Sequence, residues 1–272
     1  TRGGNLLRER PVGHTPPGSA GSALAGSIVL VTGASTGIGR AIALAAAHAG
    51  ADVALTFRSS EPYARQVREQ IESLDRRAQA FPLDLADPSS IATLATAVRA
   101  VFGRVDVWIN NAGADILTGT NAQLTDLEKL DMLLTVDLRG TMLASWEAAR
   151  IMRDQPTGGV ILNMSWDHVL TGMAGRNPEM FSAVKGGVLS FSKSLARSLA
   201  PRIRVNVLAP GWIETEFGSD LDANRKRQVA DATPLRRWGT PDDVAQAAVF
   251  LASPHASFIT GQTLLVGGGA VM

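Results

Sequence analysis

A glycine-rich turn between an apolar run and a helical pattern is the feature that most constrains the fold of this chain. Residues 28–31 (IVLV) are apolar and β-rich, and residues 32–39 (TGASTGIG) form the turn. Apolar residues then recur at helical spacing at Ile38, Ile42 and Ala46. Strand, glycine turn and helix in this order are typical of dinucleotide-binding units, and this context disfavours the alternative of a purely structural turn.

The three glycines of the turn have separate expected roles. Gly33 allows a sharp turn off the strand, Gly37 lets a pyrophosphate approach the backbone, and Gly39 lets the helix pack close to the sheet. The free N–H groups and the dipole at the start of the helix favour an anion at the same place. The turn therefore predicts a set of cofactor-binding residues: Gly33, Ser35, Thr36, Gly37, Ile38 and Gly39.

Strand and helix patterns alternate along the rest of the chain. The predicted strands are residues 28–31, 52–57, 78–83, 105–109, 159–164, 203–207 and 262–266. The predicted helices after the first are residues 61–74, 89–102, 124–153, 180–199 and 241–251. We therefore expect a single-domain, Rossmann-like α/β fold: a doubly wound parallel sheet of about seven strands with helices on both faces. Ligands are expected at the carboxyl ends of the strands.

Length and composition indicate how the chain is divided. Residues 1–24 are rich in Gly, Pro and Ser, which predicts a flexible N-terminal extension, with a small partner-binding arm as the alternative. Residues 25–272 predict one dinucleotide-binding domain, because a chain of 272 residues with 45% hydrophobic content can bury one large core.

The composition also argues against several classes of protein. A net charge of +1 implies no nucleic acid or other polyanionic partner. The absence of cysteine excludes disulfides and thiol chemistry. No apolar run reaches the ~18 residues that a membrane span needs, and the N-terminus lacks the apolar region of a secretory signal. We therefore expect a cytoplasmic protein that does not bind membranes.

Four ordered motifs resemble those of the short-chain dehydrogenase/reductase family. They are residues 32–39 (TGASTGIG), residues 110–113 (NNAG), residues 210–215 (PGWIET) and the C-terminal stretch of residues 234–269. The resemblance extends over residues 25–272. Because the motifs occur in order and each follows a predicted strand or helix, the resemblance is specific.

The resemblance implies further cofactor contacts and self-association. Asp84 and Leu85 resemble the family's adenine-contacting pair, although Asp84 has the alternative role of capping the helix that starts near Ser89. The other implied cofactor-binding residues are Asn111, Ala112, Gly113, Lys185, Pro210, Gly211, Ile213 and Thr215. The family commonly forms dimers and tetramers, which implies a homodimer or homotetramer built through residues 124–153, 180–199 and 264–272.

The end of the second predicted strand indicates which cofactor is bound. An acidic residue there accepts hydrogen bonds from the 2′-OH of NAD(H), whereas a basic residue accommodates the 2′-phosphate of NADP(H). Residues 56–60 read TFRSS, with no carboxylate before Glu61. Arg58 offers a forked donor suited to phosphate, and Ser59 adds a hydroxyl. We therefore expect NADP(H); the alternative for Arg58 is a solvated surface side chain.

The family's Tyr-x-x-x-Lys motif is incomplete in this chain. In the family, the phenol exchanges a proton while hydride moves, and the ammonium lowers the phenol pKa and holds the nicotinamide ribose. Lys185 is in place, but Phe181 occupies the tyrosine position. The single tyrosine of the chain, Tyr63, lies in the helix after the second strand, at the adenosine end. Phe181 therefore removes a group that typically contributes about 10²–10⁴-fold to the rate.

Two more positions depart from the family pattern. Where the family usually has Ser-Ser after the fifth strand, this chain has Ser165-Trp166, so Trp166 takes the catalytic position if the second serine is the catalytic one. The family's asparagine in the long middle helix is Asp137 here. Asp137 either holds a water of the proton relay or is a substitution without chemical consequence.

Three residues are candidates to replace the missing phenol. Asp167 and His168 follow the fifth strand, and Asp115 follows the NNAG motif. Each has an ordinary polar loop residue as its alternative role, and His168 has the intrinsic pKa that suits proton exchange near neutrality. The predicted catalytic set is therefore Asp137, Ser165, His168, Phe181 and Lys185.

Bulky apolar residues near these positions predict an apolar, partly aromatic pocket, which favours a hydrophobic or ring-containing substrate. They are Trp166, Met173, Met180, Phe181 and Trp212. The leading hypothesis is an NADPH-dependent oxidoreductase acting on a carbonyl, imine or activated double bond, with a proton donor other than tyrosine. The alternatives are a non-redox dehydratase, isomerase or cyclase, a catalytically weak dinucleotide-binding subunit, and a Tyr-to-Phe trapped variant of an ordinary ketoreductase.

Overall fold

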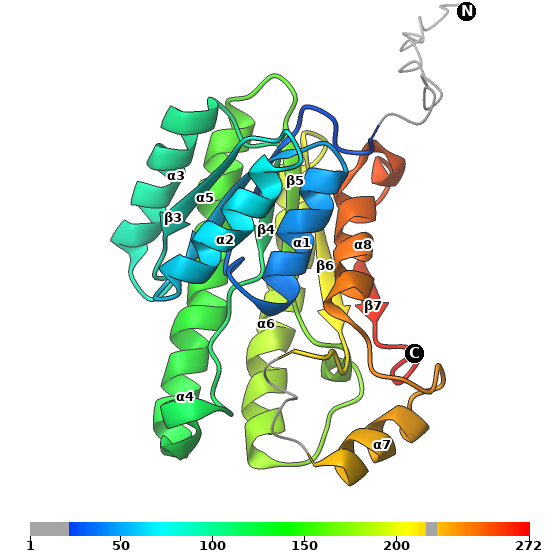
Figure 1. The fold of residues 1–272 in the computed structure, drawn as a ribbon. Helices are drawn as coiled ribbons and strands as arrows, with labels where there is room; N and C mark the ends of the chain where they lie inside the picture. The colour runs from blue at the N-terminus through cyan, green and yellow to red at the C-terminus, as the bar shows by residue number, and fades with distance from the viewer. Residues whose placement is uncertain (1–21, 216–221) are drawn as a thin grey trace, which may run out of the picture.

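One parallel sheet organises the molecule. The computed structural model describes residues 22–215 and 222–272 (Figure 1). Seven strands lie in the order β3-β2-β1-β4-β5-β6-β7. They are β1 (Ile28–Val31), β2 (Asp52–Phe57), β3 (Ala78–Pro82), β4 (Val107–Asn110), β5 (Gly159–Met164), β6 (Ile203–Pro210) and β7 (Thr263–Val266). Val29 of the central β1 pairs with Val53 of β2 on one side and with Val107 of β4 on the other.

Helices cover both faces of the sheet, as the sequence predicts (Figure 1). One layer contains α1 (Gly37–His48), α2 (Glu61–Glu72) and α8 (Pro241–Ala252). The other contains α3 (Pro88–Phe102), α5 (Thr141–Arg153) and α6 (Arg176–Leu199). β1 is apolar throughout because Val29 and Val31 pack against the first layer while Leu30 packs against the second. The expected fold class is therefore confirmed.

Two further helices, α4 (Asp126–Leu133) and α7 (Ala223–Ala232), lie beyond the carboxyl ends of the strands (Figure 1). Together with the loops that follow β4, β5 and β6, they surround the region where ligands bind in open parallel sheets. Across the part of the chain that the structure describes, no helix combines the length and the apolar character needed to cross a membrane.

Several element boundaries differ from the sequence prediction, among them the following three. Residues 124–153 are not one continuous α-helix, because α4 passes through a π-helical segment, Leu134–Gly140, before α5 begins. Helix α6 begins at Arg176 rather than at residue 180, which adds one turn at the site. β4 begins two residues later than predicted, since the Val105 N–H donates to the Gln155 side chain instead of to a strand.

The N-terminal boundary of the domain also lies earlier than predicted. Residues 1–21 of the predicted extension are outside the described residues. Leu24 is buried in the core, and its N–H donates to Ala49 O at 2.8 Å. The fold therefore includes residues before position 25.

Candidate active site

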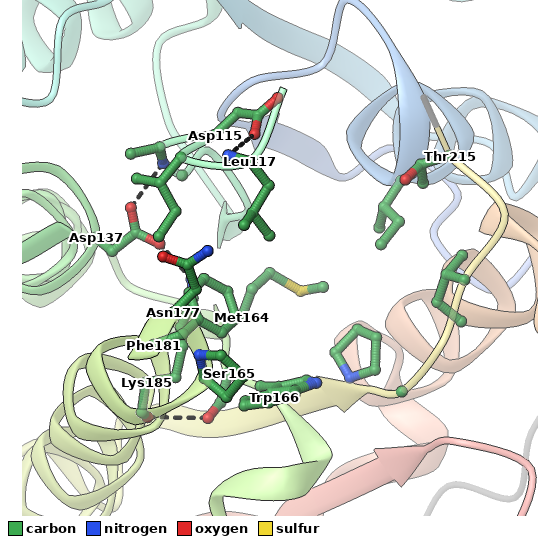
Figure 2. Close-up of a pocket in the computed structure, with 18 of the residues that line it drawn as sticks. Asp115, Leu117, Asp137, Met164, Ser165, Trp166, Asn177, Phe181, Lys185 and Thr215 are labelled. Carbon is green, nitrogen blue, oxygen red and sulfur yellow. Dashed lines mark hydrogen bonds and ion pairs between the residues drawn. The ribbon is translucent and has the colours of Figure 1, made fainter. Parts of the chain in front are cut away.

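A cavity of about 550 Å³ opens beyond the carboxyl ends of β4, β5 and β6. Figure 2 shows Asp137, Asn177, Phe181 and Lys185 on one side of this cavity and Thr215 on the other. This cavity lies at the edge of the sheet where ligands are expected to bind.

The glycine turn after β1 has the geometry that its sequence predicts. Gly33 and Gly37 have φ angles of 63° and 54°, which few non-glycine residues adopt. A Cβ added at Gly39 would lie 2.2 Å from Gly33 O, so only glycine fits there. Thr36 precedes α1 without a side-chain cap, and the first turn of α1 has no acidic residue. The N–H groups at this helix start are therefore free to bind an anion.

Thr32 joins the glycine turn to the strand end at β4, a role that the sequence analysis missed. Its hydroxyl accepts hydrogen bonds from the N–H groups of Asn111 and Ala112, both at 2.9 Å. The Asn111 side-chain amide in turn donates hydrogen bonds to Thr32 O and Gly33 O. Asn111 therefore connects the glycine turn after β1 to the loop after β4, and it also lines the cavity. The threonine that leads the glycine turn was the available signal.

The predicted adenosine-end residues lie outside the cavity. Arg58 and Ser59 follow β2 and are exposed, and within the described residues Arg58 forms no ion pair. Glu61, the nearest carboxylate in the chain, is turned toward Arg65 of its own helix at 3.3 Å. The Arg58 guanidinium therefore remains available to an external anion.

Asp84 does not cap the helix that follows it, which corrects that alternative. The cap of α3 is Asp87, whose carboxylate accepts from Ser89 N. Asp84 instead accepts from Ala86 N in its own loop. Leu85 is buried directly against Gly140, where an added Cβ would lie 2.8 Å from Leu85 O.

An ion pair lies at the base of the cavity. Lys185 Nζ of α6 lies 2.9 Å from Asp137 Oδ2, and the two side chains are only 8% and 1% exposed. Asp137 comes from the π-helical segment, and its Oδ1 also accepts from Ala114 N at 2.7 Å. The carboxylate therefore ties α6 to the loop after β4 and occupies one of the three N–H donors of the ammonium.

One face of α6 lines the cavity. Asn177, Phe181 and Lys185 are spaced four residues apart, so they project from the same side of the helix (Figure 2). Lys185 Nζ lies 5.4 Å from the centroid of the Phe181 ring. Asn177 is a polar lining residue that the sequence analysis missed, because the helix was predicted to begin after it. Tyr63 lies on α2, 57% exposed, and does not line the cavity.

Ser165 lines the cavity, and its hydroxyl is bonded to the backbone of α6. Ser165 is buried at the end of β5, and its Oγ donates to Lys185 O at 2.9 Å. Trp166 follows it and presents its ring to the cavity, in edge-to-face contact with Phe181 at 5.4 Å. The Ser165 hydroxyl is therefore bonded to the backbone carbonyl of Lys185, the residue that carries the ammonium group.

His168, a predicted catalytic residue, does not line the cavity. Its ring stacks on Trp166 at 5.0 Å, and its Nδ1 lies 2.6 Å from Asp167 Oδ1. Asp167 is fully buried, and burial raises the pKa of its carboxyl group. The pair sits behind the cavity wall, because the loop 166–169 turns as a short 3₁₀ helix that directs Trp166 inward instead. Asp167 likewise does not line the cavity.

Asp115 lines the cavity but has a structural role in its loop. Its Oδ1 accepts from the N–H groups of Leu117 and Thr118 at 2.8 and 3.0 Å, and Oδ2 accepts from the Thr118 hydroxyl. The residue remains exposed. Asp115 therefore gives the rim of the cavity a negative charge.

The rest of the cavity wall is mainly apolar. Of the five bulky residues predicted there, Trp166, Met173, Phe181 and Trp212 line it. Met180 does not, since it is buried in a separate cluster with Leu133. Of the other predicted residues, those found in the cavity wall are Ile38, Gly113, Pro210, Gly211, Ile213 and Thr215.

Comparisons with known proteins agree with this architecture. A family model described as Enoyl-(Acyl carrier protein) reductase matches residues 33–271. An L-rhamnose 1-dehydrogenase (NAD(P)(+)) of Sphingomonas sp. is 40% identical over 250 residues, covering 90% of this chain and 96% of that protein. A 3-oxoacyl-(acyl-carrier-protein) reductase of Salmonella typhimurium is 38% identical, covering 91% and 98%. The crystal structure of a short chain dehydrogenase from Burkholderia cenocepacia in complex with NADP matches with a TM-score of 0.81 at 35% identity, covering 91% of this chain and 99% of that one.

Proposed function

The chain belongs to the short-chain dehydrogenase/reductase family and is an oxidoreductase of that type, and from this premise we propose its cofactor, substrate class and proton chemistry. The cofactor is NADP(H). The substrate is a hydrophobic or ring-containing small molecule that is reduced at a carbonyl, an imine or an activated double bond. The proton donor is not a tyrosine.

The turn after β1 supports dinucleotide binding. Gly33 and Gly37 adopt positive φ angles, Gly39 leaves no room for a Cβ, and the first turn of α1 has neither an acidic residue nor a side-chain cap from Thr36. A pyrophosphate fits this chemistry because it needs close backbone approach and positive potential. When bound, NADP(H) would supply or accept a hydride at its nicotinamide.

Arg58 and Ser59 support the choice of NADP(H). Arg58 is exposed at the end of β2 and has no ion-pair partner within the described residues, while Glu61 is turned toward Arg65. A guanidinium without a competing carboxylate suits a phosphate monoester, whereas a ribose 2′-OH is usually bound by an acid. The relative from Sphingomonas is named for both cofactors.

The contact between Lys185 and Asp137 is the main support for the proposed reaction centre. Asp137 fixes the ammonium at 2.9 Å, which leaves two further N–H donors of Lys185 to face the cavity and hold the hydroxyls of a ribose. Phe181 lies above the ammonium, where the family has its tyrosine. The reacting group is therefore positioned by Lys185 and Asn177, against a ring that exchanges no proton.

We extend the proposal to self-association. Trp146 of α5 is 49% exposed and contacts Phe191 of α6 edge to face at 6.0 Å. Leu264 and Met272, near the C-terminus, are also exposed. Apolar surfaces on these segments suit a homodimer or homotetramer. Light scattering on the purified protein measures the oligomeric state. The Trp146→Glu variant is expected to form particles of lower molar mass than the unaltered protein.

Calorimetric titration with NADPH and NADH tests the cofactor. NADPH is expected to bind more tightly, and Arg58→Ala should weaken NADPH binding about tenfold or more, since hydrogen bonds to charged groups contribute about 1.5–3 kcal/mol. The same change should leave NADH binding unaffected. Arg99→Ala, an exposed arginine at the far end of α3, is the matched control. Tighter binding of NADH, or no binding of either cofactor, would contradict the proposal.

A non-redox reaction is the second candidate, because Phe181 has no hydroxyl and the Ser165 hydroxyl bonds the backbone of α6. Following candidate substrates by both nicotinamide absorbance and mass spectrometry separates the two. Product formed with equal loss of NADPH supports reduction. If product forms while the amount of NADPH stays unchanged, the protein is a dehydratase, isomerase or cyclase.

A further inference from the structure

We propose that the substrate is a cationic iminium ion, a C=N⁺ group whose carbon accepts hydride without needing a proton, and that the aromatic wall of the cavity binds this cation. The inference rests on the proposed NADPH-dependent reduction and names its substrate class. A carbonyl oxygen must gain a proton as its carbon gains hydride, whereas a quaternary iminium nitrogen needs none. The composition of the cavity wall matches the second case.

The side chains around Lys185 are unsuited to proton donation. Phe181 lies over the ammonium and has no exchangeable proton. The Ser165 hydroxyl already donates to Lys185 O at 2.9 Å. Lys185 donates one N–H to the Asp137 carboxylate at 2.9 Å, and its other two N–H donors hold the ribose hydroxyls in the proposed function. His168, the histidine predicted as a catalytic residue, lies behind the ring of Trp166 and does not line the cavity.

The charge of the cavity wall also suits a cation. Within residues 22–215 and 222–272, its ionisable side chains are Asp115, Asp137 and Lys185, two acids and one base, for a formal total of −1. The positive charge of Lys185 is neutralised locally by Asp137, because the two atoms are in direct contact. The remaining charge is that of Asp115 at the rim. A cationic substrate therefore meets a net attractive wall.

Two aromatic rings form a corner of the cavity. Trp166 and Phe181 meet at a centroid distance of 5.4 Å and an interplanar angle of 68°, and both line the cavity. Trp212 adds a third ring to the same wall. Ring faces attract alkylated nitrogen cations, and each such contact contributes about 0.5–2 kcal/mol depending on desolvation. Aromatic walls of this kind bind iminium ions in preference to neutral molecules of the same shape.

The reduction balances without a protein acid. The iminium carbon accepts a hydride, with its two electrons, from the reduced nicotinamide, and a C–H bond forms. The C=N π pair becomes the lone pair of a neutral tertiary amine. The positive charge passes from the substrate to the oxidised nicotinamide. No proton enters or leaves, so Phe181 removes nothing that this reaction requires.

Turnover of two matched bicyclic probes tests the proposal. N-methyl-3,4-dihydroisoquinolinium is the cation, and 1-tetralone is the neutral ketone. Each enzymatic rate is divided by the uncatalysed rate with NADPH, and 4-deuterated NADPH identifies the product by mass. The rate enhancement for the iminium is expected to exceed that for the ketone by about 100-fold or more. Equal or greater enhancement for tetralone, or no enhancement for the iminium, would overturn the proposal.

A Phe181→Tyr variant tests whether the two probes differ because only the ketone needs a proton. Adding a phenol beside Lys185 should raise tetralone reduction by about 10²-fold or more and should change iminium reduction far less, because only the ketone needs a proton. Equal rises for both probes would contradict the proposal. Calorimetry with NADPH distinguishes this failure from a failure of the proposed function, since a protein that does not bind NADPH fails both.

A binding measurement gives a second readout that does not depend on turnover. In the presence of NADPH, N,N-dimethyl-tetrahydroisoquinolinium, which cannot be reduced, should bind about tenfold more tightly than 2,2-dimethyltetralin, its neutral isostere. Asp115→Asn keeps the acceptor for Leu117 N and removes the charge. It should weaken binding of the cation and leave binding of the isostere unchanged. Equal affinities for the two ligands in the unaltered protein would overturn the proposal.

Discussion

Asp137 Oδ2 contacts Lys185 Nζ at 2.9 Å, and the pair is almost fully withdrawn from water, with side-chain exposures of 1% and 8%. The π-helical segment before α5 brings the carboxylate to this point, and the third turn of α6 brings the ammonium. Because Asp137 also accepts from Ala114 N, one carboxylate joins three elements at the base of the cavity. The contact therefore links the stability of the fold to the position of the cationic group.

Removing Asp137 should destabilise the protein strongly. Asp137→Ala leaves the Lys185 ammonium buried without a partner, which costs about 3–5 kcal/mol in the free energy of unfolding. Asp137→Asn keeps an acceptor for Ala114 N and for Nζ, so its loss should be smaller. Urea denaturation measures both. Asp126→Asn breaks an exposed pair with Arg176 and serves as control, with an expected loss of about 0–1 kcal/mol. An Ala variant no less stable than the Asn variant would contradict the buried-pair argument.

Gly39→Ala should abolish the packing of α1 against the glycine turn. The new Cβ would lie 2.2 Å from Gly33 O and 2.4 Å from Asn111 Nδ2, so the backbone must shift. We expect a loss of about 1–3 kcal/mol, typical of overpacking, and weaker dinucleotide binding by calorimetry. Gly186→Ala is the matched control, because its Cβ would meet only Val169 Cγ1 at 3.4 Å. This control should be neutral or slightly stabilising, since Ala favours a helix by about 1 kcal/mol over Gly.

The sheet and the glycine turn could be predicted because they depend on local pattern. β1 is apolar at every position because helices cover both faces of the sheet, and this is visible in a single run of residues. The positive φ angles of Gly33 and Gly37 likewise follow from a turn that few residues other than glycine adopt. Alternating strands and helices then leave few topologies, so the fold class followed from the sequence.

The details of the site could not be predicted because they depend on side-chain direction across elements. Asp137 and Lys185 are far apart in the sequence, and only the π-helical insertion brings their charges together. Asn177 was missed because the helix was predicted to begin at residue 180, although Gly175 and Pro178 suit a helix start just before and after Arg176. His168 was expected in the cavity, but one turn of 3₁₀ helix directs Trp166 there instead.

The start of α8 should show acid-dependent stability through Asp243. The Arg237 guanidinium, bonded at 2.7 and 2.9 Å, holds the pKa of the Asp243 carboxyl group well below its usual value, and Thr240 N also donates to it. A lowered pKa in the folded state gives stability that is present above the unfolded pKa of about 3.9 and is lost as pH falls. Asp243→Asn should therefore cost about 0.5–1 kcal/mol near neutral pH, as for the loss of a largely exposed ion pair.

This difference between the unaltered protein and Asp243→Asn should shrink as the pH falls from about 4 toward the lowered folded-state pKa, because the unfolded chain then binds a proton that the folded Asp243 carboxylate does not. Urea denaturation over a pH series measures it. The neighbouring Asp242→Asn is the control: it removes an exposed acid from the same helix turn but breaks no bond to Arg237. A constant difference across the series would contradict the role assigned to the Arg237 contact.

Asp167 should have the opposite pH dependence. The side chain of Asp167 is fully buried, and its Oδ2 has no hydrogen-bond partner within the described residues. The backbones of Gly211 and Gly267 pack so closely against Oδ2 that a Cβ added at either glycine would clash with it. Burial raises the pKa of this carboxyl group, although the contacts with His168 act in the other direction. A raised pKa in the folded state means that its favourable contribution is present below the unfolded pKa and is lost as pH rises through the folded value.

Asp167→Asn removes this titration while keeping an oxygen for the N–H groups of His168. The free energy of unfolding of the variant, relative to the unaltered protein, is therefore expected to increase as pH rises from about 4 to about 7. Urea denaturation of both proteins across that range measures the slope. Asp131→Asn, which removes an exposed acid of α4, controls for the loss of one charge. A difference that decreases with rising pH would mean that the contacts with His168 outweigh burial, and that the pair behind Trp166 is held together by charge.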